Sequence, residues 1–175
     1  FDAFFRKIPN GGGYALMAGL DKIIDYIKNL KFTDREIEYF RSLGYSEEML
    51  EYFKNFKFTG SISAIPDGTP IFPNEPILTV KAPFVEAQII ETTILAMLNG
   101  SIEHATAARR IVEATPKNVK IMEFGPRRAD GTEAAIDTSI YALMAGCHAI
   151  SNSMVANMLG IKAVGTMAHS FIEAY

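Results

Sequence analysis

Strand-like and helix-like segments alternate after residue 116, and this alternation restricts the fold more than any other feature of the sequence. Short apolar runs predict three strands, at residues 119–124, 149–151 and 161–164. The segments between them have apolar residues at helical spacing and predict two helices, at 132–146 and 153–159. Strands that alternate with helices pair in parallel, in a doubly wound sheet or in a barrel. Because such folds place their chemistry beyond the carboxyl ends of the strands, the three strand ends are the candidate sites.

Two adjacent arginines, Arg127 and Arg128, follow the first predicted strand. Each guanidinium is a planar fork that can bind a carboxylate or a phosphate through paired hydrogen bonds. The alternative is a solvated pair of charges in a loop. After the second strand, Ser151 and Asn152 open a helix, where free backbone N–H groups can hold a phosphate. Simple capping of that helix is the competing interpretation.

The third strand end carries a hydroxyl, an imidazole and a second hydroxyl, at Thr166, His169 and Ser170. An imidazole can accept a phosphoryl group or act as acid or base near neutral pH. The alternative is a strand that stops in a polar turn. If the strands are parallel, we expect all three ends to converge on one edge.

The first half of the sequence predicts a helical scaffold. Residues 1–9 predict a strand buried on both faces, and 10–13, with three glycines, a flexible turn. The first predicted helix begins at Leu20. The second begins with a capping box formed by Thr33 and Glu36 and ends at Gly44, and the third begins at Ser46.

The segment 58–83 has short β-rich runs separated by turns that contain proline, and it resembles the small β-barrel of biotinyl and lipoyl carriers. Such a carrier needs an exposed lysine at a hairpin tip. The turns here offer Asp67, Gly68, Asn74 and Glu75 instead, which argues against that role. The segment 84–115 predicts a long and mostly buried helix with a basic pair near its end, although Gly100 weakens it as one unbroken helix.

Composition excludes several classes of protein. Hydrophobic residues make up 49% of the 175 residues and charged residues 21%, which suffices for a packed core, and the net charge of −3 predicts no affinity for nucleic acid or anionic membranes. No segment reaches the roughly 18 consecutive apolar residues of a membrane span. The single cysteine, Cys147, cannot form an internal disulfide and favours a reducing, cytoplasmic setting, and its spacing to His148 matches no metal site. Because the first residue is not methionine and the last ones begin an uncapped helix, we expect these residues to come from a longer polypeptide.

Motifs over nearly the whole chain resemble those of the nicotinate phosphoribosyltransferase family, in the family's order and spacing. Three of them stand at the predicted strand ends: Glu123-Phe-Gly-Pro-Arg127-Arg128-Ala, Ser151-Asn152 and Gly165-Thr166-Met-Ala168-His169-Ser170. The others lie upstream: Phe4-Phe5-Arg6-Lys7-Ile-Pro9, Gly12-Gly13-Tyr14-Ala15, Ala18-Gly19-Leu20, Asn74-Glu75-Pro76-Ile77 and Glu91-Thr92-Thr-Ile-Leu95.

The resemblance implies an α/β fold in two parts. An N-terminal α/β domain with a small β-rich part would occupy residues 1–116, including a long linking helix at 84–115. The first βα units of an irregular, type II phosphoribosyltransferase-like α/β barrel would occupy 117–175. The resemblance also implies a homodimer with active sites at the subunit interface.

The resemblance further implies transfer of the phosphoribosyl group from 5-phosphoribosyl 1-pyrophosphate to nicotinic acid, giving nicotinate mononucleotide in NAD salvage. The reaction is coupled to ATP hydrolysis, and Mg²⁺ would accompany the pyrophosphate donor, with no ligand to it identifiable in this sequence. His169 would be phosphorylated by ATP, Thr166 would lie against the nicotinate, and Ser170 would also bind substrate. Arg127 and Arg128 would hold the pyridine carboxylate.

The resemblance also implies roles for Arg110, Ser151 and Asn152. Arg110 matches the arginine of the family motif Ala-Thr-x-Ala-Ala-Arg and is assigned to the dimer-shared site, while Ser151 and Asn152 would bind phosphate. The sequence departs from the family at residues 145–148, where two glycines and a Thr-Ser-Asn turn are usual, and at Ala107, where lysine is common. The family's N-terminal tyrosine motif and its later barrel strands are absent, so we expect these 175 residues alone not to complete an active site.

Other functions remain as alternatives. The chain could be a non-catalytic fragment that serves dimerisation or binding, or part of a related pyridine phosphoribosyltransferase. The nicotinamide-specific relative has a single arginine where this sequence has Arg127 and Arg128. The quinolinate-specific relative shares the fold, but we do not expect the His-Ser motif in it.

Overall fold

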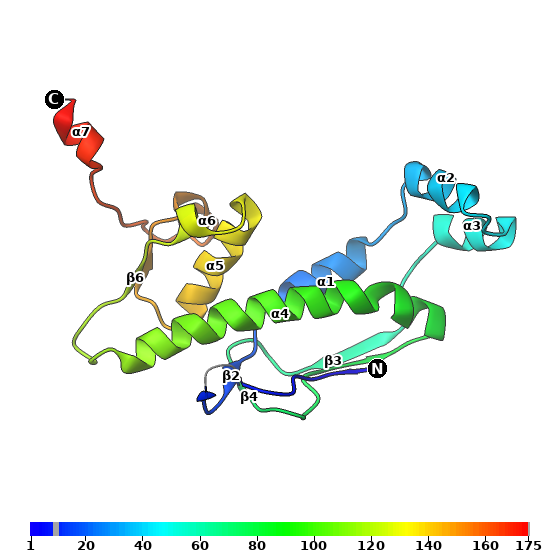
Figure 1. The fold of residues 1–175 in the computed structure, drawn as a ribbon, viewed down its shortest axis with the longest axis horizontal. Coiled ribbons are helices and arrows are strands. Elements are labelled where there is room, and N and C mark those ends of the chain that lie inside the picture. Colours follow the sequence, from blue (N-terminus) through cyan, green and yellow to red (C-terminus); the bar gives the residue numbers. More distant parts are fainter. Residues whose placement is uncertain (9–10, 175) are drawn as a thin grey trace.

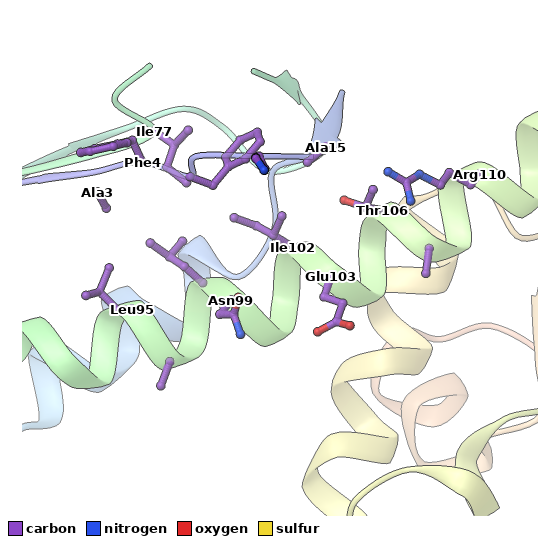
Figure 2. A pocket seen from close by; sticks show the side chains of 15 residues that line it. Ala3, Phe4, Ala15, Ile77, Leu95, Asn99, Ile102, Glu103, Thr106 and Arg110 are labelled. Carbon is purple, nitrogen blue, oxygen red and sulfur yellow. The ribbon is translucent and has the colours of Figure 1, made fainter. Parts of the chain in front are cut away.

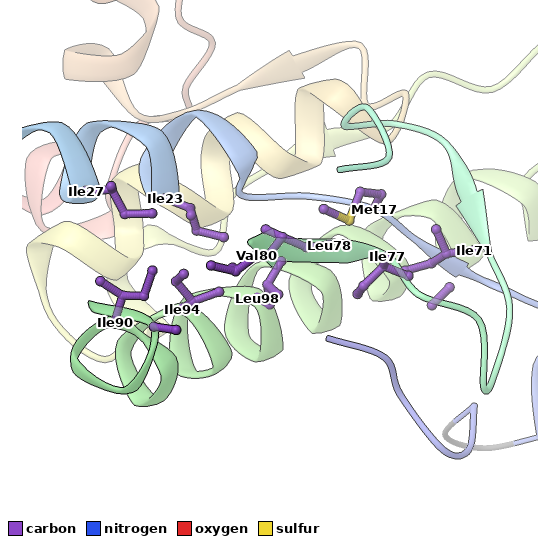
Figure 3. Packing of buried hydrophobic residues seen from close by; sticks show 12 residues of the cluster. Met17, Ile23, Ile27, Ile71, Ile77, Leu78, Val80, Ile90, Ile94 and Leu98 are labelled. Atoms are coloured by element: carbon purple, nitrogen blue, oxygen red, sulfur yellow. The ribbon is translucent and has the colours of Figure 1, made fainter. Parts of the chain in front are cut away.

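The structure is a computed structural model and describes residues 1–8 and 11–174. A single long helix, α4 (Phe84–Ala114), runs through most of the molecule (Figure 1). The main core lies where α4 and α1 (Leu20–Asn29) pack on strand β5 (Leu78–Lys81). Figure 3 shows Ile23 and Ile27 of α1 facing Val80 of β5 and Ile94 of α4.

The predicted helical scaffold is confirmed. Helix α2 (Asp34–Ser42) begins with the Thr33–Glu36 capping box, and Gly44 follows its end with φ of 86°. Helix α3 (Glu47–Lys54) is capped by the Ser46 side chain, which accepts the N–H of Met49. These two helices form a small aromatic cluster of their own around Phe40 and Phe53.

The strands form two small antiparallel sheets in place of a carrier-like barrel. In the first, β5 lies between β1 (Asp2–Ala3) and β3 (Ser61–Ala64), and in the second β2 (Ala15–Leu16) pairs with β4 (Pro70–Ile71). The prediction of a strand over residues 1–9, buried on both faces, was wrong in length and burial. Only residues 2–3 pair with β5, and the side chains of Phe1 and Phe4 are about half exposed. Pro9 and Asn10 lie outside the described residues.

Helix α4 is unbroken through Gly100 and spans 31 residues, close to the predicted range. The expectation that most of it is buried was wrong. One stripe, which includes Ile90, Ile94 and Leu98, packs into the core, while apolar residues on other faces, such as Leu95 and Ile111, are exposed. A helix packed on one side can bury only the residues that recur every three to four positions.

Beyond α4 the predicted alternation is confirmed for two strands and two helices. Strand β6 (Met122–Glu123) pairs in parallel with β7 (Ala149–Ile150), in register Glu123 to Ile150. The connection contains the short 3₁₀ helix η2 (Pro126–Arg128) and helix α5 (Thr132–Met144), and helix α6 (Ser153–Met158) follows β7. Helix α5 packs on α4 through a cluster that includes Leu16, Ala105 and Tyr141.

The third predicted strand, at 161–164, does not form. Val164 donates its N–H to the carbonyl of Ile150 at 2.9 Å, but this single bond does not make a ladder. The chain then continues without regular structure to helix α7 (His169–Glu173). His169 therefore stands in the first turn of a helix, whereas the sequence predicted a helix that starts at Phe171. The division of the chain near residue 116 stays a prediction.

Candidate functional site

The carboxyl ends of β6 and β7 bring together the first two predicted strand ends. The N–H of Ser151 donates to the carbonyl of Glu123 at 2.9 Å, so the turn after β7 lies directly beside the end of β6. Arg127 and Arg128 follow on η2, and both are exposed at this edge. The parallel pair therefore brings the Ser151–Asn152 turn to the end of β6, from which the arginine-bearing turn also starts.

The side chain of Glu123 organises this edge, a role that sequence analysis did not predict. Its carboxylate accepts the N–H of Gly125 and lies 3.2 Å from the hydroxyl of Ser139, which is fully buried on α5. An added Cβ on Gly125 would lie 2.8 Å from Oε1 of Glu123. The sequence signal that could have been used is a carboxylate at a strand end with glycine two residues later.

Asn152 caps α6, in agreement with the simpler of its two predicted roles. Its Oδ1 accepts the N–H groups of Met154 and Val155 at 3.2 and 3.3 Å, and its Nδ2 donates to the carbonyl of Ala135 at 3.2 Å. These bonds attach α6 to α5. A phosphate-binding role for Ser151 and Asn152 stays a prediction.

The third predicted strand end does not converge on this edge. All residues from 165 to 174 are exposed, including Thr166, His169 and Ser170. Helix α7 stands at the end of an extended segment, away from the body of the molecule (Figure 1). The expected convergence rested on a third parallel strand, and without that strand the histidine is not held at the edge. The chemical roles of these three residues stay predictions.

Arg110 lies at one end of a groove of about 680 Å³ between the N-terminal segment and α4. The groove has apolar walls that include Phe4, Ile77, Leu95 and Ile102 (Figure 2). The guanidinium of Arg110 packs over Gly12, where an added Cβ would lie 2.2 Å from Nη2. Gly12 thus allows the arginine to lie against the backbone.

The neighbouring Arg109 belongs to a polar network that the sequence did not reveal. Its Nε donates to Glu113 Oε1 at 3.1 Å and to the Tyr14 hydroxyl at 3.3 Å, and its Nη1 donates to the carbonyl of Ala145 at 3.4 Å. Tyr14 in turn donates to Glu113, and this bond, together with Arg109, lowers the pKa of the Glu113 carboxyl. The network joins α4 to the residue before β2 and to the C-cap of α5, so Arg109 contributes to the packing of these elements.

Three comparisons place the chain among known proteins. A family profile described as the N-terminal domain of nicotinate phosphoribosyltransferase matches residues 1–99. The chain belongs to the nicotinate phosphoribosyltransferase family. Over its full length it is 43% identical to the nicotinate phosphoribosyltransferase of Bacillus subtilis and 39% identical to that of Mycobacterium tuberculosis. It spans 36% and 38% of these two proteins.

Solved structures confirm the family's fold in this chain. The structure superposes on human nicotinic acid phosphoribosyltransferase with a TM-score of 0.90 and 28% identity, over 99% of this chain and 36% of the human one. The nicotinate-nucleotide pyrophosphorylase of Pyrococcus furiosus superposes with a TM-score of 0.76 and 27% identity, over 99% of this chain and 37% of that one. The α/β class and the family resemblance seen in the sequence are both confirmed.

Within this family fold, the described residues offer no cluster of three or more His, Cys, Asp or Glu side chains suited to a metal ion. No helix in residues 1–8 and 11–174 is long and apolar enough to cross a membrane. Cys147 is half-buried, and burial, with a smaller effect of the nearby Glu123 charge, raises the pKa of its thiol.

Proposed function

We propose that this chain is part of an enzyme that transfers the phosphoribosyl group of 5-phosphoribosyl 1-pyrophosphate to nicotinic acid, with ATP hydrolysis, in NAD salvage. One observation carries the proposal: the similarity to named nicotinate phosphoribosyltransferases covers 100% of this chain, including residues 100–175 with the arginine pair and His169. As proposed, the enzyme is a cytoplasmic homodimer whose subunits share the active sites.

The arginine edge suits the acceptor substrate. Nicotinate carries a carboxylate, and the exposed guanidinium groups of Arg127 and Arg128 can neutralise it through paired hydrogen bonds. Nicotinamide has a neutral amide that cannot do so, which makes this edge the source of selectivity. Arg110, in the groove between the N-terminal segment and α4, would serve the part of the site that two subunits share.

The transfer at the ribosyl carbon depends mainly on how the enzyme positions the two substrates. As pyrophosphate leaves, positive charge develops on the ribosyl carbon, so the enzyme gains most from holding the anions in position. Ser151 lies beside the end of β6, and Ser151 and Asn152 would bind a phosphate of the donor. Mg²⁺ would enter with the pyrophosphate.

His169 would couple ATP to this reaction. A ring nitrogen attacks the γ-phosphorus of ATP, the bond to the β-phosphate oxygen breaks, and ADP leaves. Water later hydrolyses the phosphohistidine. Thr166 would contact the nicotinate and Ser170 would stand beside the imidazole. Their exposure in this chain is compatible with a site completed by further residues.

The test uses the full-length protein with nicotinate, 5-phosphoribosyl 1-pyrophosphate and ATP, with formation of nicotinate mononucleotide as the readout. We expect product with nicotinate and little with nicotinamide. Product from nicotinamide alone would assign the protein to the nicotinamide-specific relatives, and product from neither would overturn the proposal.

A second candidate is a non-catalytic dimerisation or binding fragment. The observation in its favour is that residues 165–174 are exposed and the histidine is not gathered with the arginines. Mass spectrometry and light scattering of material of 175 residues would establish its length and its oligomeric state. Detectable turnover by such material would rule this candidate out.

A further inference from the structure

We propose that Glu123 is a positioning residue, which holds the arginine turn against helix α5 and thereby sets the affinity for the substrate carboxylate. This inference rests on the proposed function of Arg127 and Arg128. Glu123 acts through the backbone of the turn and is not itself placed on substrate.

Glu123 connects the buried part of α5 to the exposed arginines through a chain of hydrogen bonds. The Ser139 hydroxyl, which is completely buried, lies 3.2 Å from Oε2 of Glu123 and 2.8 Å from the carbonyl of Ala135. The other carboxylate oxygen, Oε1, accepts the N–H of Gly125. The carbonyl of Gly125 accepts the N–H of Arg128 at 2.8 Å, which closes the 3₁₀ turn that bears both arginines.

The residue type at position 125 fits this close approach of the carboxylate. Gly125 has φ of −87°, a value that any residue adopts, so its backbone conformation does not require glycine. An added Cβ would lie 2.8 Å from Oε1 of Glu123, so the carboxylate would have to shift away from the loop. The carboxylate thus folds back onto its own loop, and the loop has no side chain at the point of contact.

Backbone hydrogen bonds to β7 and to the turn after it also hold Glu123 in place. It pairs with Ile150 in the β6–β7 ladder, and its carbonyl accepts the N–H of Ser151 at 2.9 Å. The carboxylate therefore belongs to a strand end that β7 holds in place, and its bond to Gly125 restrains the turn that follows. Without the Glu123 carboxylate, the N–H of Gly125 would lose this hydrogen bond, and the guanidinium groups of the turn would sample more positions.

The test compares four variants of the full-length protein. Glu123→Gln keeps the shape but has a single acceptor oxygen, Ser139→Ala removes the buried hydroxyl, and Gly125→Ala forces the carboxylate off the loop. Asp130→Asn is the matched control, because it removes the same charge from an exposed position in the same connection.

We expect the KM for nicotinate to rise about 10-fold to 100-fold in Glu123→Gln, the range for loss of a hydrogen bond to a charged group, while kcat changes less than about 3-fold. Gly125→Ala should act in the same direction and Ser139→Ala more weakly. Selectivity for nicotinate over nicotinamide should fall in parallel, and Asp130→Asn should leave both parameters near the wild-type values.

Hydrogen exchange of the full-length protein separates this proposal from the proposed function. In Glu123→Gln, exchange in residues 124–129 should speed up while α4 and α5 keep their protection. A wild-type protein without nicotinate turnover would overturn the proposed function and the link to carboxylate affinity. Unchanged exchange in residues 124–129, or an unchanged KM with lower thermal stability, would overturn the positioning role of Glu123.

Discussion

The hydroxyl of Tyr141 lies 2.8 Å from Oγ of Ser101, where helix α5 packs against α4. Both residues are buried. Gly19, with φ of 98°, makes room for this pair, because a Cβ there would lie 2.5 Å from the Ser101 oxygen. Helices α4 and α5 are thus joined by this hydrogen bond, and the N-cap of α1 packs against it.

Replacing Tyr141 by phenylalanine should lower the free energy of unfolding by about 1–3 kcal/mol, because the buried Ser101 hydroxyl loses its partner. Urea denaturation of wild type and variant measures the difference. Tyr39→Phe is the matched control, since the Tyr39 side chain is 59% exposed and its hydroxyl stays in water. Equal losses in the two variants would contradict the assignment.

Alkaline pH should lower the free energy of unfolding through ionisation of Tyr141. Burial raises the pKa of the Tyr141 phenol, partly offset by the Ser101 hydrogen bond. The folded state therefore holds this proton more tightly than the unfolded chain, whose phenol titrates at about pH 10. The stabilising contribution is full below that pH and is lost as the pH rises through the higher folded value. The decline in urea midpoint above about pH 10 should be smaller in Tyr141→Phe than in wild type.

Glu86 should be a stabilising carboxylate. It is 5% exposed, and Thr59 donates its N–H to Oε2 at 2.7 Å and its hydroxyl to Oε1 at 2.8 Å. Glu86→Ala removes both hydrogen bonds to a charged acceptor, at a cost of about 1–3 kcal/mol, and water can then satisfy the donors of the exposed Thr59. Glu103→Ala, an exposed change on the same helix, should cost less than about 0.5 kcal/mol in the same thermal or urea melts.

Two adjacent glycines provide a paired test of Arg110. A Cβ at Gly12 would lie 2.2 Å from Nη2 of Arg110, whereas a Cβ at Gly13 has nothing within 4 Å. Gly12→Ala should displace the guanidinium and lower kcat/KM of the full-length enzyme by about 10-fold, as for loss of one charge-assisted contact. Gly13→Ala should keep activity near wild type. Similar activity in both variants would remove Arg110 from the shared site.

His169→Asn should abolish phosphate transfer from ATP to the full-length protein without unfolding it, because the side chain is exposed. Incorporation of labelled γ-phosphate measures the transfer, and circular dichroism checks the fold. His104→Asn, an exposed histidine on α4, is the control and should be labelled like wild type. Labelling that persists in His169→Asn would exclude His169 as the phosphate acceptor.

Local chemistry explains which predictions succeeded. The capping box at Thr33 and Glu36 involves neighbours three residues apart, and its hydrogen bonds form within one turn of helix. The parallel pairing of β6 and β7 followed from the helix between them. Asn152 as a cap is likewise a short-range relationship. The caps depend on residues near each other in the chain, and the strand pairing depends on the one helix that separates the two strands.

Long-range contacts explain the failures. Residues 161–164 have the composition of a strand, yet a strand forms only where a neighbour supplies a full ladder, and the chain makes one bond there. The exposed faces of α4 cannot be told from its buried stripe by composition, because apolar residues occur on both. The network of Arg109, Tyr14 and Glu113 joins residues nearly a hundred positions apart.

The sequence by itself determined the helices with their caps, the parallel strand pair, the arginine pair at its end and the family to which the chain belongs. The tertiary structure alone decided that Glu123 ties the arginine turn to Ser139, that Gly12 makes room for Arg110, and that the stretch Gly165 to Ser170 stands exposed and apart from the arginines. The physical reason is distance along the chain. Capping and helical periodicity act within a few residues, whereas the surroundings of a charged side chain depend on elements that meet only after the chain has folded.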